Sequence, residues 1–185
     1  PLGERIWSSF FQSVTTRTAG FNTADLDKMT DSGKMGMVLL MVIGGSPGST
    51  AGGMKTTTAA VLFAMAISVF RKNEQAHLYN RRIAEETQRN AATIFVLYMM
   101  LFTGSAMFIS YVEKVPLVTA FFETASAIGT VGLSLGLTPT LCLASRLVLI
   151  CLMFFGRVGG LTLIFATVSG KRTEYKYPQE KINVG

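Results

Sequence analysis

The sequence predicts an all-α membrane protein in which a helix, a pore loop and a second, interrupted helix form a repeated unit. Apolar residues make up 49% of the 185 positions and charged residues only 15%, a balance typical of membrane proteins. Residues 91–112 hold 22 consecutive positions without a charged side chain, enough for one transmembrane helix. A short run of small residues, followed by a glycine-rich apolar segment, occurs twice.

The two short runs align at an offset of 112 residues, which places Gly20 on Gly132 and Gly44 on Gly156. Upstream, residues 10–13 resemble a segment that lies 111 residues later. Chance matching of common residues is the alternative explanation, and the agreement of several motifs in one register argues against it. The repeated unit is therefore a short helix, a short run and a long interrupted helix.

Both short runs are interpreted as ion filters, at residues 17–23 and 129–134. Backbone that is neither helix nor strand persists at membrane depth only where protein buries it or where it lines a water-filled path. Such runs can present carbonyl oxygens to a dehydrated cation. The filter residues are Thr18, Ala19, Gly20 and Phe21 in the first run and Thr130, Val131, Gly132 and Leu133 in the second.

The first unit is expected to cover residues 1–70 and to open with a pore helix at 4–16, which has too few apolar residues to span a bilayer. After the filter, three acidic residues supply outer-surface charge and a helix N-cap. These residues are Asp25, Asp27 and Asp31.

A helix over residues 33–70 follows, and a run with five glycines and a proline interrupts it between residues 44 and 55. Helix is expected to resume near Thr56. Because interrupted helices mark ion or substrate sites in transporters, we interpret this run as a gating loop. The gate residues are Gly44, Gly45, Ser46, Pro47, Gly48, Ser49, Thr50, Ala51, Gly52, Gly53 and Lys55, together with Arg157.

Residues 71–90 form a polar linker that is expected to be a cytoplasmic helix or helix pair, with His77 as an ordinary surface residue. This linker and the tail at 171–185 contain clusters of Lys and Arg, and short loops of that kind stay in the cytoplasm. The filters would then face outward. The net charge of +6 is concentrated in these two segments and does not indicate binding to nucleic acid.

The second unit is expected to cover residues 91–170. Its elements are a helix over 91–112, a pore helix over 116–127 opened by Pro116, the filter at 129–134 and a broken helix over 138–169, interrupted at 156–160. Cys142 and Cys151 are too far apart along a helix for a disulfide and are expected to be buried free thiols. Arg146 is expected to extend to the outer interface or to bind acidic partners.

Arg157 is the most informative charge, because the repeat aligns it with Gly45, at a position expected in mid-membrane. A guanidinium keeps its proton, and at bilayer depth it is costly unless it meets water or a partner. A structural explanation is that Arg157 pairs with Glu123 or caps exposed carbonyls. A functional explanation is an electrostatic barrier in the permeation path. The two explanations overlap and both stay open.

Other classes of function fit the residues less well. The run from Gly48 is similar to the sequence pattern of a phosphate-binding loop. However, Met54 is inserted before Lys55, so the lysine comes one residue later than that pattern requires. The membrane segments bring together no acid, base and nucleophile, which argues against an enzyme. A non-conducting scaffold would use small residues on continuous helices, whereas Pro47 and the paired glycines interrupt them.

Four motifs in order resemble the C-terminal half of the Trk/Ktr/HKT superfamily of cation transporters, and in detail a Ktr-type (KtrB-like) potassium uptake subunit. These motifs are TTRTAGFNT at 15–23, GSPGSTAGGMKT at 45–56, GTVGLS at 129–134 and GRVGG at 156–160. The resemblance implies four helix-pore-helix repeats around one pore, of which this chain holds two. Gly20 and Gly132 would be filter glycines, the glycine-rich run the gate, and Arg157 its facing arginine.

The resemblance further implies uptake of K+, with Na+ as a possible second ion, through a channel-like pore in a bacterial plasma membrane. The alternative is a sodium-translocating or non-conducting membrane subunit of a larger ion-transport complex. The implied partners are the lipid bilayer, a second copy in a homodimer and a cytoplasmic nucleotide-binding regulatory ring of the KtrA type, with no covalent cofactor. Two repeats and one helix are missing, so the chain is expected to be the C-terminal part of something longer.

Overall fold

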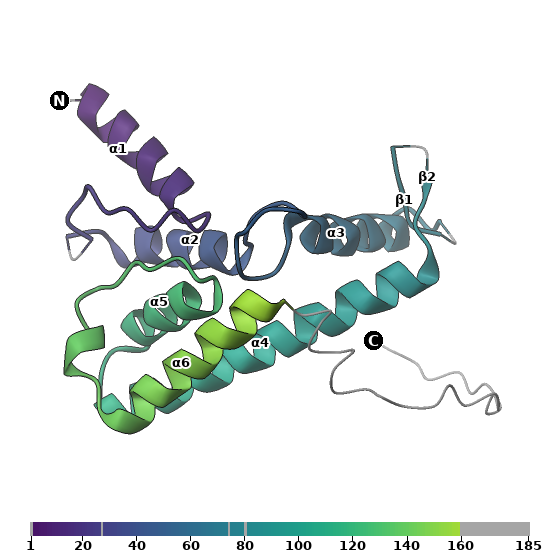
Figure 1. Cartoon of the computed structure of the whole chain (residues 1–185). Helices are drawn as coiled ribbons and strands as arrows, with labels where there is room; N and C mark the ends of the chain where they lie inside the picture. The colour runs from purple at the N-terminus through teal and green to yellow at the C-terminus, as the bar shows by residue number, and fades with distance from the viewer. Residues whose placement is uncertain (1, 27, 74, 80, 160–185) are drawn as a thin grey trace.

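The described residues are mostly helical, as the sequence predicts (Figure 1). The computed structural model describes residues 2–26, 28–73, 75–79 and 81–159. Their elements are α1 (Leu2–Thr15), α2 (Asp31–Val42), α3 (Thr56–Phe70), β1 (His77–Leu78), β2 (Arg81–Arg82), α4 (Glu85–Glu113), α5 (Leu117–Ile128), the 3-10 turn η1 (Thr138–Thr140) and α6 (Leu143–Val158). Helices α2 and α3 lie nearly end to end, and α4 runs past α3, α5 and α6.

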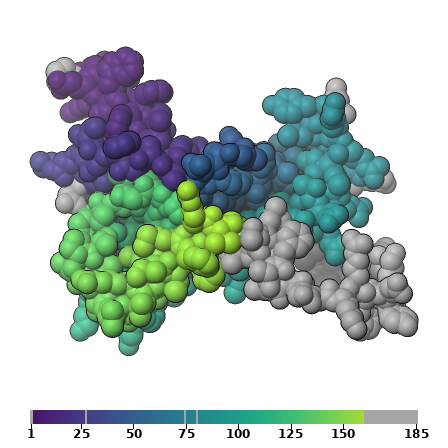
Figure 2. Space-filling view, in the orientation of Figure 1, coloured from purple at the N-terminus to yellow at the C-terminus, as the bar shows by residue number. Residues whose placement is uncertain are grey.

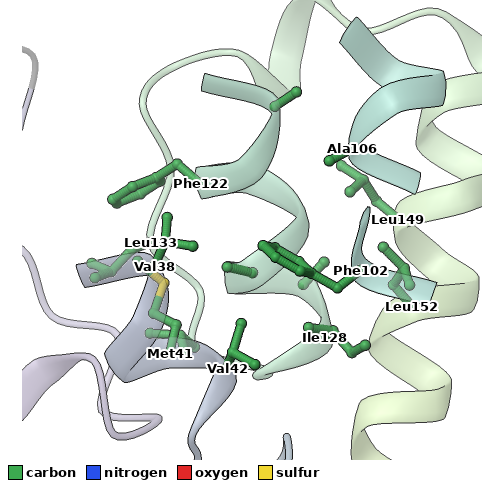
Figure 3. Close-up of a cluster of buried hydrophobic side chains, with 14 of the residues drawn as sticks. Val38, Met41, Val42, Phe102, Ala106, Phe122, Ile128, Leu133, Leu149 and Leu152 are labelled. Carbon is green, nitrogen blue, oxygen red and sulfur yellow. The ribbon is translucent and has the colours of Figure 1, made fainter. Parts of the chain in front are cut away.

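The short helix α5 is the centre of the fold. It packs against α2, α4 and α6, and every residue from Phe122 to Ile128 is buried. Ala, Ser and Thr make up half of its sequence, and small side chains let neighbouring helices come close. Figure 3 shows Phe122 and Ile128 among apolar side chains from these neighbours, including Val38, Phe102 and Leu149. The predicted pore helix over 116–127 is thus one residue from its observed bounds, with Pro116 as the N-cap.

Helix α6 passes the end of α5 at Gly156. A Cβ atom built on Gly156 would lie 2.0 Å from the carbonyl oxygen of Ile128, closer than any side chain tolerates. The glycine therefore permits the contact between these two helices. The interruption predicted at 156–160 is wrong at its start, because Gly156, Arg157 and Val158 are still helical and α6 ends at Val158. Residues 160–169 of the predicted broken helix, and the tail at 171–185, lie outside the described residues.

Helix α4 is the one helix in the described part of the chain that is long and apolar enough to cross a membrane. It starts six residues before the predicted position, at Glu85, because two glutamates in its first turn complement the helix dipole. It ends at Lys114, which takes the left-handed conformation with φ 55°.

The prediction of a helix or helix pair for the linker is wrong over its first part. Strands β1 and β2 instead form an antiparallel hairpin, in which His77 pairs with Arg82. The turn places Tyr79 at φ 49°, and Ile83 N–H donates to the Ala76 carbonyl at 3.0 Å. These residues lack an apolar stripe that could hold a helix against the body. His77 is exposed, as expected.

Helix α1 projects from the body (Figure 2) and begins and ends within two residues of the predicted bounds. Large apolar side chains on it are exposed, in contrast to Phe122 and Ile128 of α5. The exposed side chains are Leu2, Ile6, Trp7, Phe10 and Val14. The prediction that an aspartate caps the next helix is wrong. Thr30 is the N-cap of α2, and its hydroxyl accepts a hydrogen bond from Gly33 N–H at 3.2 Å.

Cys142 and Cys151 are free thiols, but the prediction that they are buried is wrong, since both are exposed on α6 and its N-cap. An apolar helix predicted to lie in a membrane can keep one face free of protein contacts, and Cys151 lies away from the buried face of α6. Cys142 is exposed at the end of the helix, where it is the N-cap. Arg146 donates to the Pro139 carbonyl at 2.7 Å, so its described hydrogen bond is to backbone.

Candidate ion filter and gate loop

The two predicted filter runs have matching backbone conformations. Gly20 has φ 74° and Gly132 has φ 91°, in the left-handed region that side chains disfavour. Both glycines therefore take a conformation that an added side chain would strain. Two residues earlier in each run, Thr18 has φ 69° and Thr130 has φ 50°. A left-handed β-branched residue is uncommon, and its occurrence at two equivalent positions indicates a backbone that the surroundings impose.

The two runs lie side by side. The hydroxyl of Thr18 donates to the carbonyl of Gly129 at 3.2 Å. A Cβ atom built on Gly20 would lie only 2.3 Å from the carbonyl oxygen of Val131. The backbone of the first run is thus in contact with the backbone of the second, and Gly20 has both a steric and a conformational reason to be glycine.

Equivalent side chains anchor the C-terminal end of each run to its own short helix. In the first, the amide of Gln12 donates to the side chain of Asn22 at 3.4 Å. In the second, the hydroxyl of Ser134 donates to the carboxylate of Glu123 at 2.6 Å. Gln12 and Glu123 occupy matching places in the 111-residue register, and Asn22 and Ser134 match in the 112-residue register.

Glu123 is only 3% exposed and accepts three hydrogen bonds from the end of the second run and the segment that follows it. Besides Ser134, the N–H of Leu135 donates to it at 2.9 Å and the hydroxyl of Thr138 at 2.8 Å. A buried carboxylate needs such donors, and three of them fix the segment in place. Glu123 and Arg157, both within the described residues, form no ion pair with each other.

The predicted gating loop is closed at its base by backbone hydrogen bonds. Helix α2 ends at Val42 and α3 begins at Thr56, the residue where helix was expected to resume. Gly44 N–H donates to the Met54 carbonyl at 2.7 Å, and Met54 N–H donates to the Val42 carbonyl at 3.2 Å. Thr56 N–H donates to the carbonyl of Gly45 at 3.2 Å. We call this set of bonds the loop neck.

Two cationic side chains hold the tip of the loop. The ammonium of Lys55 donates to the carbonyls of Ser49, at 3.4 Å, and of Ala51. The guanidinium of Arg157 donates to the carbonyl of Thr50, which lies between them. Three successive carbonyls are therefore satisfied by positive groups, and the explanation that Arg157 caps exposed carbonyls agrees with its described contact.

The loop lies directly against the second run. Gly53 N–H donates to the Gly156 carbonyl at 3.3 Å, and a Cβ atom on Gly52 would lie 2.3 Å from the hydroxyl oxygen of Thr130. That hydroxyl oxygen is buried and has no hydrogen-bond partner among the described residues. An open cavity of about 500 Å³ extends along this side of the run, and Thr130, Gly132, Ser134 and Arg157 contribute to its lining.

Comparison with known proteins identifies the family. The family TrkH, described as a cation transport protein, matches residues 1–175. The chain belongs to the TrkH family of cation transport proteins. This is a family of cation transporters and not a family of enzymes, and its members are membrane proteins.

Curated relatives of this TrkH chain have been assigned to potassium and sodium uptake. The chain is 41% identical over 189 residues to the potassium/sodium uptake protein NtpJ of Enterococcus hirae, covering 98% of this chain and 42% of the relative. It is 35% identical over 182 residues to the Ktr system potassium uptake protein B of Bacillus subtilis, covering 98% and 41%. The corresponding protein of Vibrio alginolyticus is 34% identical over 178 residues, covering 96% and 39%. The TrkH chain thus spans about two fifths of these relatives.

Several features of the site were not predicted from the sequence. The left-handed Thr18 and Thr130, and the pairing of Gln12 with Asn22, were not anticipated. Arg17, which precedes the first filter, was not singled out either, although its guanidinium donates to the carbonyls of Ile43 at 2.8 Å and Gly44 at 2.9 Å. The signal was available, because Arg17 is a second arginine beside a predicted membrane-buried backbone run.

Proposed function

We propose that this chain supplies two of the four repeats of a channel-like potassium uptake pore. The observation that carries the proposal is the matched left-handed backbone of the two runs, beside a glycine loop whose tip is held by positive side chains. In this proposal, Thr18 to Phe21 and Thr130 to Leu133 are filter strands, and residues 44–55 form the gate.

The filter assignment is supported by the backbone. Left-handed residues separated by one position change the direction in which peptide carbonyls point, and a filter requires carbonyls that face an ion. The run before Gly132 borders an open cavity, and a Cβ atom on Gly132 would meet nothing within 4 Å. The cavity side of this run is where we place K+.

The gate assignment is supported by charge and by contact. Arg157 and Lys55 place two permanent or nearly permanent positive charges at the tip of a loop that touches the second filter. At about 6 Å and an effective dielectric near 20, one such charge repels K+ by roughly 3 kcal/mol. A loop held in this way would obstruct cations below the filter, and its displacement would relieve both obstruction and repulsion.

The membrane arrangement and the partners follow the same proposal. The filters face outward, and the basic linker at 71–90 and tail at 171–185 face the cytoplasm. There they could meet a nucleotide-binding ring of the KtrA type, with two copies of the transporter forming a homodimer. Na+ is the alternative transported ion, because one relative is named for potassium and sodium uptake.

A chimera tests the proposal. Residues 1–185 would replace the matching segment of the Bacillus subtilis relative, and uptake would be measured in a bacterial strain without its own potassium uptake systems. We expect K+ uptake that Gly132→Ser makes less selective over Na+. Uptake of Na+ alone would support the sodium alternative, while a chimera present in the membrane without cation uptake would support a non-conducting subunit. Unchanged selectivity in Gly132→Ser would refute the filter assignment.

A further inference from the structure

The side chain of Arg17 joins the first filter run to the start of the gating loop. Arg17 directly precedes the filter residue Thr18 and follows the last turn of α1, where its N–H donates to the Val14 carbonyl at 3.0 Å. Its guanidinium crosses to the end of α2. There one terminal nitrogen donates to the carbonyls of Ile43 at 2.8 Å and Gly44 at 2.9 Å.

The end of α2 needs such a group. The last carbonyls of a helix lack partners within the helix and form the negative end of its dipole. Ile43 is the C-cap, with φ −86° and ψ 88°, so the chain leaves the helix at this residue. Hydrogen bonds from a guanidinium are charge-assisted, and the charge does not titrate. Arg17 therefore supplies a fixed cap at the first bend of the loop.

Gly44 lies at the base of the loop. Its N–H belongs to the loop neck, and a Cβ atom built on it would lie 2.0 Å from the carbonyl oxygen of Gly52. Arg17 thus contacts the residue at which both sides of the loop meet. Lys55 and Arg157, by contrast, contact the tip.

The second filter contacts the end of α2 at the equivalent position, but through backbone. Gly129 matches Arg17 in the repeat register, and a Cβ atom on Gly129 would lie 2.6 Å from the carbonyl oxygen of Met41. The end of α2 is thus held from two sides by the residues that begin the two filters. Only on the first side is the connection a side chain that can be replaced without displacing backbone.

We infer that Arg17 is a positioning residue that couples the first filter to the gating loop by holding the loop hinge at Ile43 and Gly44. The inference rests on the proposed function of these segments. Movement of the filter backbone at Thr18, as ions enter or leave, reaches the hinge through one side chain and two hydrogen bonds. Loss of these bonds frees the hinge while leaving the filter residues themselves unchanged.

The experiment compares Arg17→Gln with Arg146→Gln in the chimera that carries the full chain. Arg146 is the matched control, because its guanidinium also donates to a carbonyl, that of Pro139, away from the loop. Charge-assisted hydrogen bonds are among the stronger ones, so we expect Arg17→Gln to raise the maximal rate of K+ uptake about tenfold. The KM for K+ and the selectivity over Na+ should stay unchanged, and Arg146→Gln should behave as the unsubstituted chimera.

Uptake per folded molecule decides the result. Unaltered kinetics in Arg17→Gln, or lower thermal stability with the same rate per molecule, would overturn the inference. If Arg17→Gln does not reach the membrane, Arg17→Lys decides: a smaller rise in rate at constant KM supports coupling, and an unaltered rate refutes it. Gly132→Ser, measured in the same experiment, distinguishes failure of the Arg17 inference from failure of the proposed function. If Gly132→Ser changes selectivity while Arg17→Gln has no effect, the filter assignment is kept and the Arg17 inference is refuted. Absence of uptake by the unsubstituted chimera overturns both proposals.

Discussion

Alanine at three left-handed glycines should produce three different outcomes, and the clearest is Gly20→Ala. Gly20, Gly132 and Gly136 have φ values of 74°, 91° and 78°. Each alanine should therefore cost roughly 1–2 kcal/mol of folding free energy, because an L residue is strained in this region. Strain alone predicts equal effects at all three sites.

Contacts separate Gly20 from the other two positions, and Gly132 differs from Gly136 in lying within a proposed filter strand. The added Cβ at Gly20 would lie 2.3 Å from the Val131 carbonyl oxygen, whereas at Gly132 and Gly136 nothing lies within 4 Å. Restoring an ordinary contact of about 3.5 Å requires a shift of roughly 1 Å in the backbone of one run. Binding geometry has to hold within about 0.5 Å, so this shift should disturb a carbonyl proposed to face K+.

The assay measures K+ uptake over a range of concentrations, with and without competing Na+, together with the thermal stability of each purified variant. We expect Gly20→Ala to lose most selective uptake, Gly132→Ala to lose part of it and Gly136→Ala to retain it. Gly132→Ala and Gly136→Ala should lose similar stability. Equal uptake in all three variants would refute the argument that the two filter runs share a backbone contact.

Three further predictions concern the gate and the filter anchor. Arg157→Gln should raise K+ flux by up to about a hundredfold, if the repulsion of roughly 3 kcal/mol limits passage; an unchanged flux per folded molecule, with lower melting temperature, would identify an anchor instead. Deleting Pro47 to Ser49 at the loop tip should raise flux at constant selectivity, and a well-folded deletion without that rise would count against a gate. Glu123→Ala should leave three hydrogen-bond donors without an acceptor, destabilise the protein by about 1–3 kcal/mol and weaken K+ uptake affinity. Glu123→Gln should be milder, since the first unit carries Gln12 at the matching place, and equal effects of both substitutions on affinity would contradict this role.

Sequence patterns located the elements whose cause is local. The glycines and proline between residues 44 and 55 prevent helix wherever they occur, so the ends of α2 and α3 were predictable to within a residue or two. The uncharged run at 91–112 similarly located α4. Repetition of the short runs located Gly20 and Gly132 as equivalent positions, and both have a left-handed backbone.

Features that depend on contacts between distant residues were not predictable. The left-handed backbone of Thr18 and Thr130 cannot be predicted from their residue type, because the surrounding chain imposes it. Arg17 meets the end of α2 some 26 residues later, and no spacing rule connects them. The linker hairpin was missed because the charged residues there suit several local structures, and a two-residue pairing leaves hardly any periodic signal.

If α2 and α3 together cross the membrane, as the proposed function requires, the loop neck has a mechanical consequence for that span. Helices α2 and α3 have 12 and 15 residues, about 18 Å and 22 Å in length, and the bonds between Gly44 and Met54 join them into one strut. A bilayer of different thickness would then tilt this strut as a unit instead of stretching the loop between its halves. Ion passage should accordingly vary little with lipid acyl-chain length, whereas weakening the neck would make the same transporter responsive to membrane thickness.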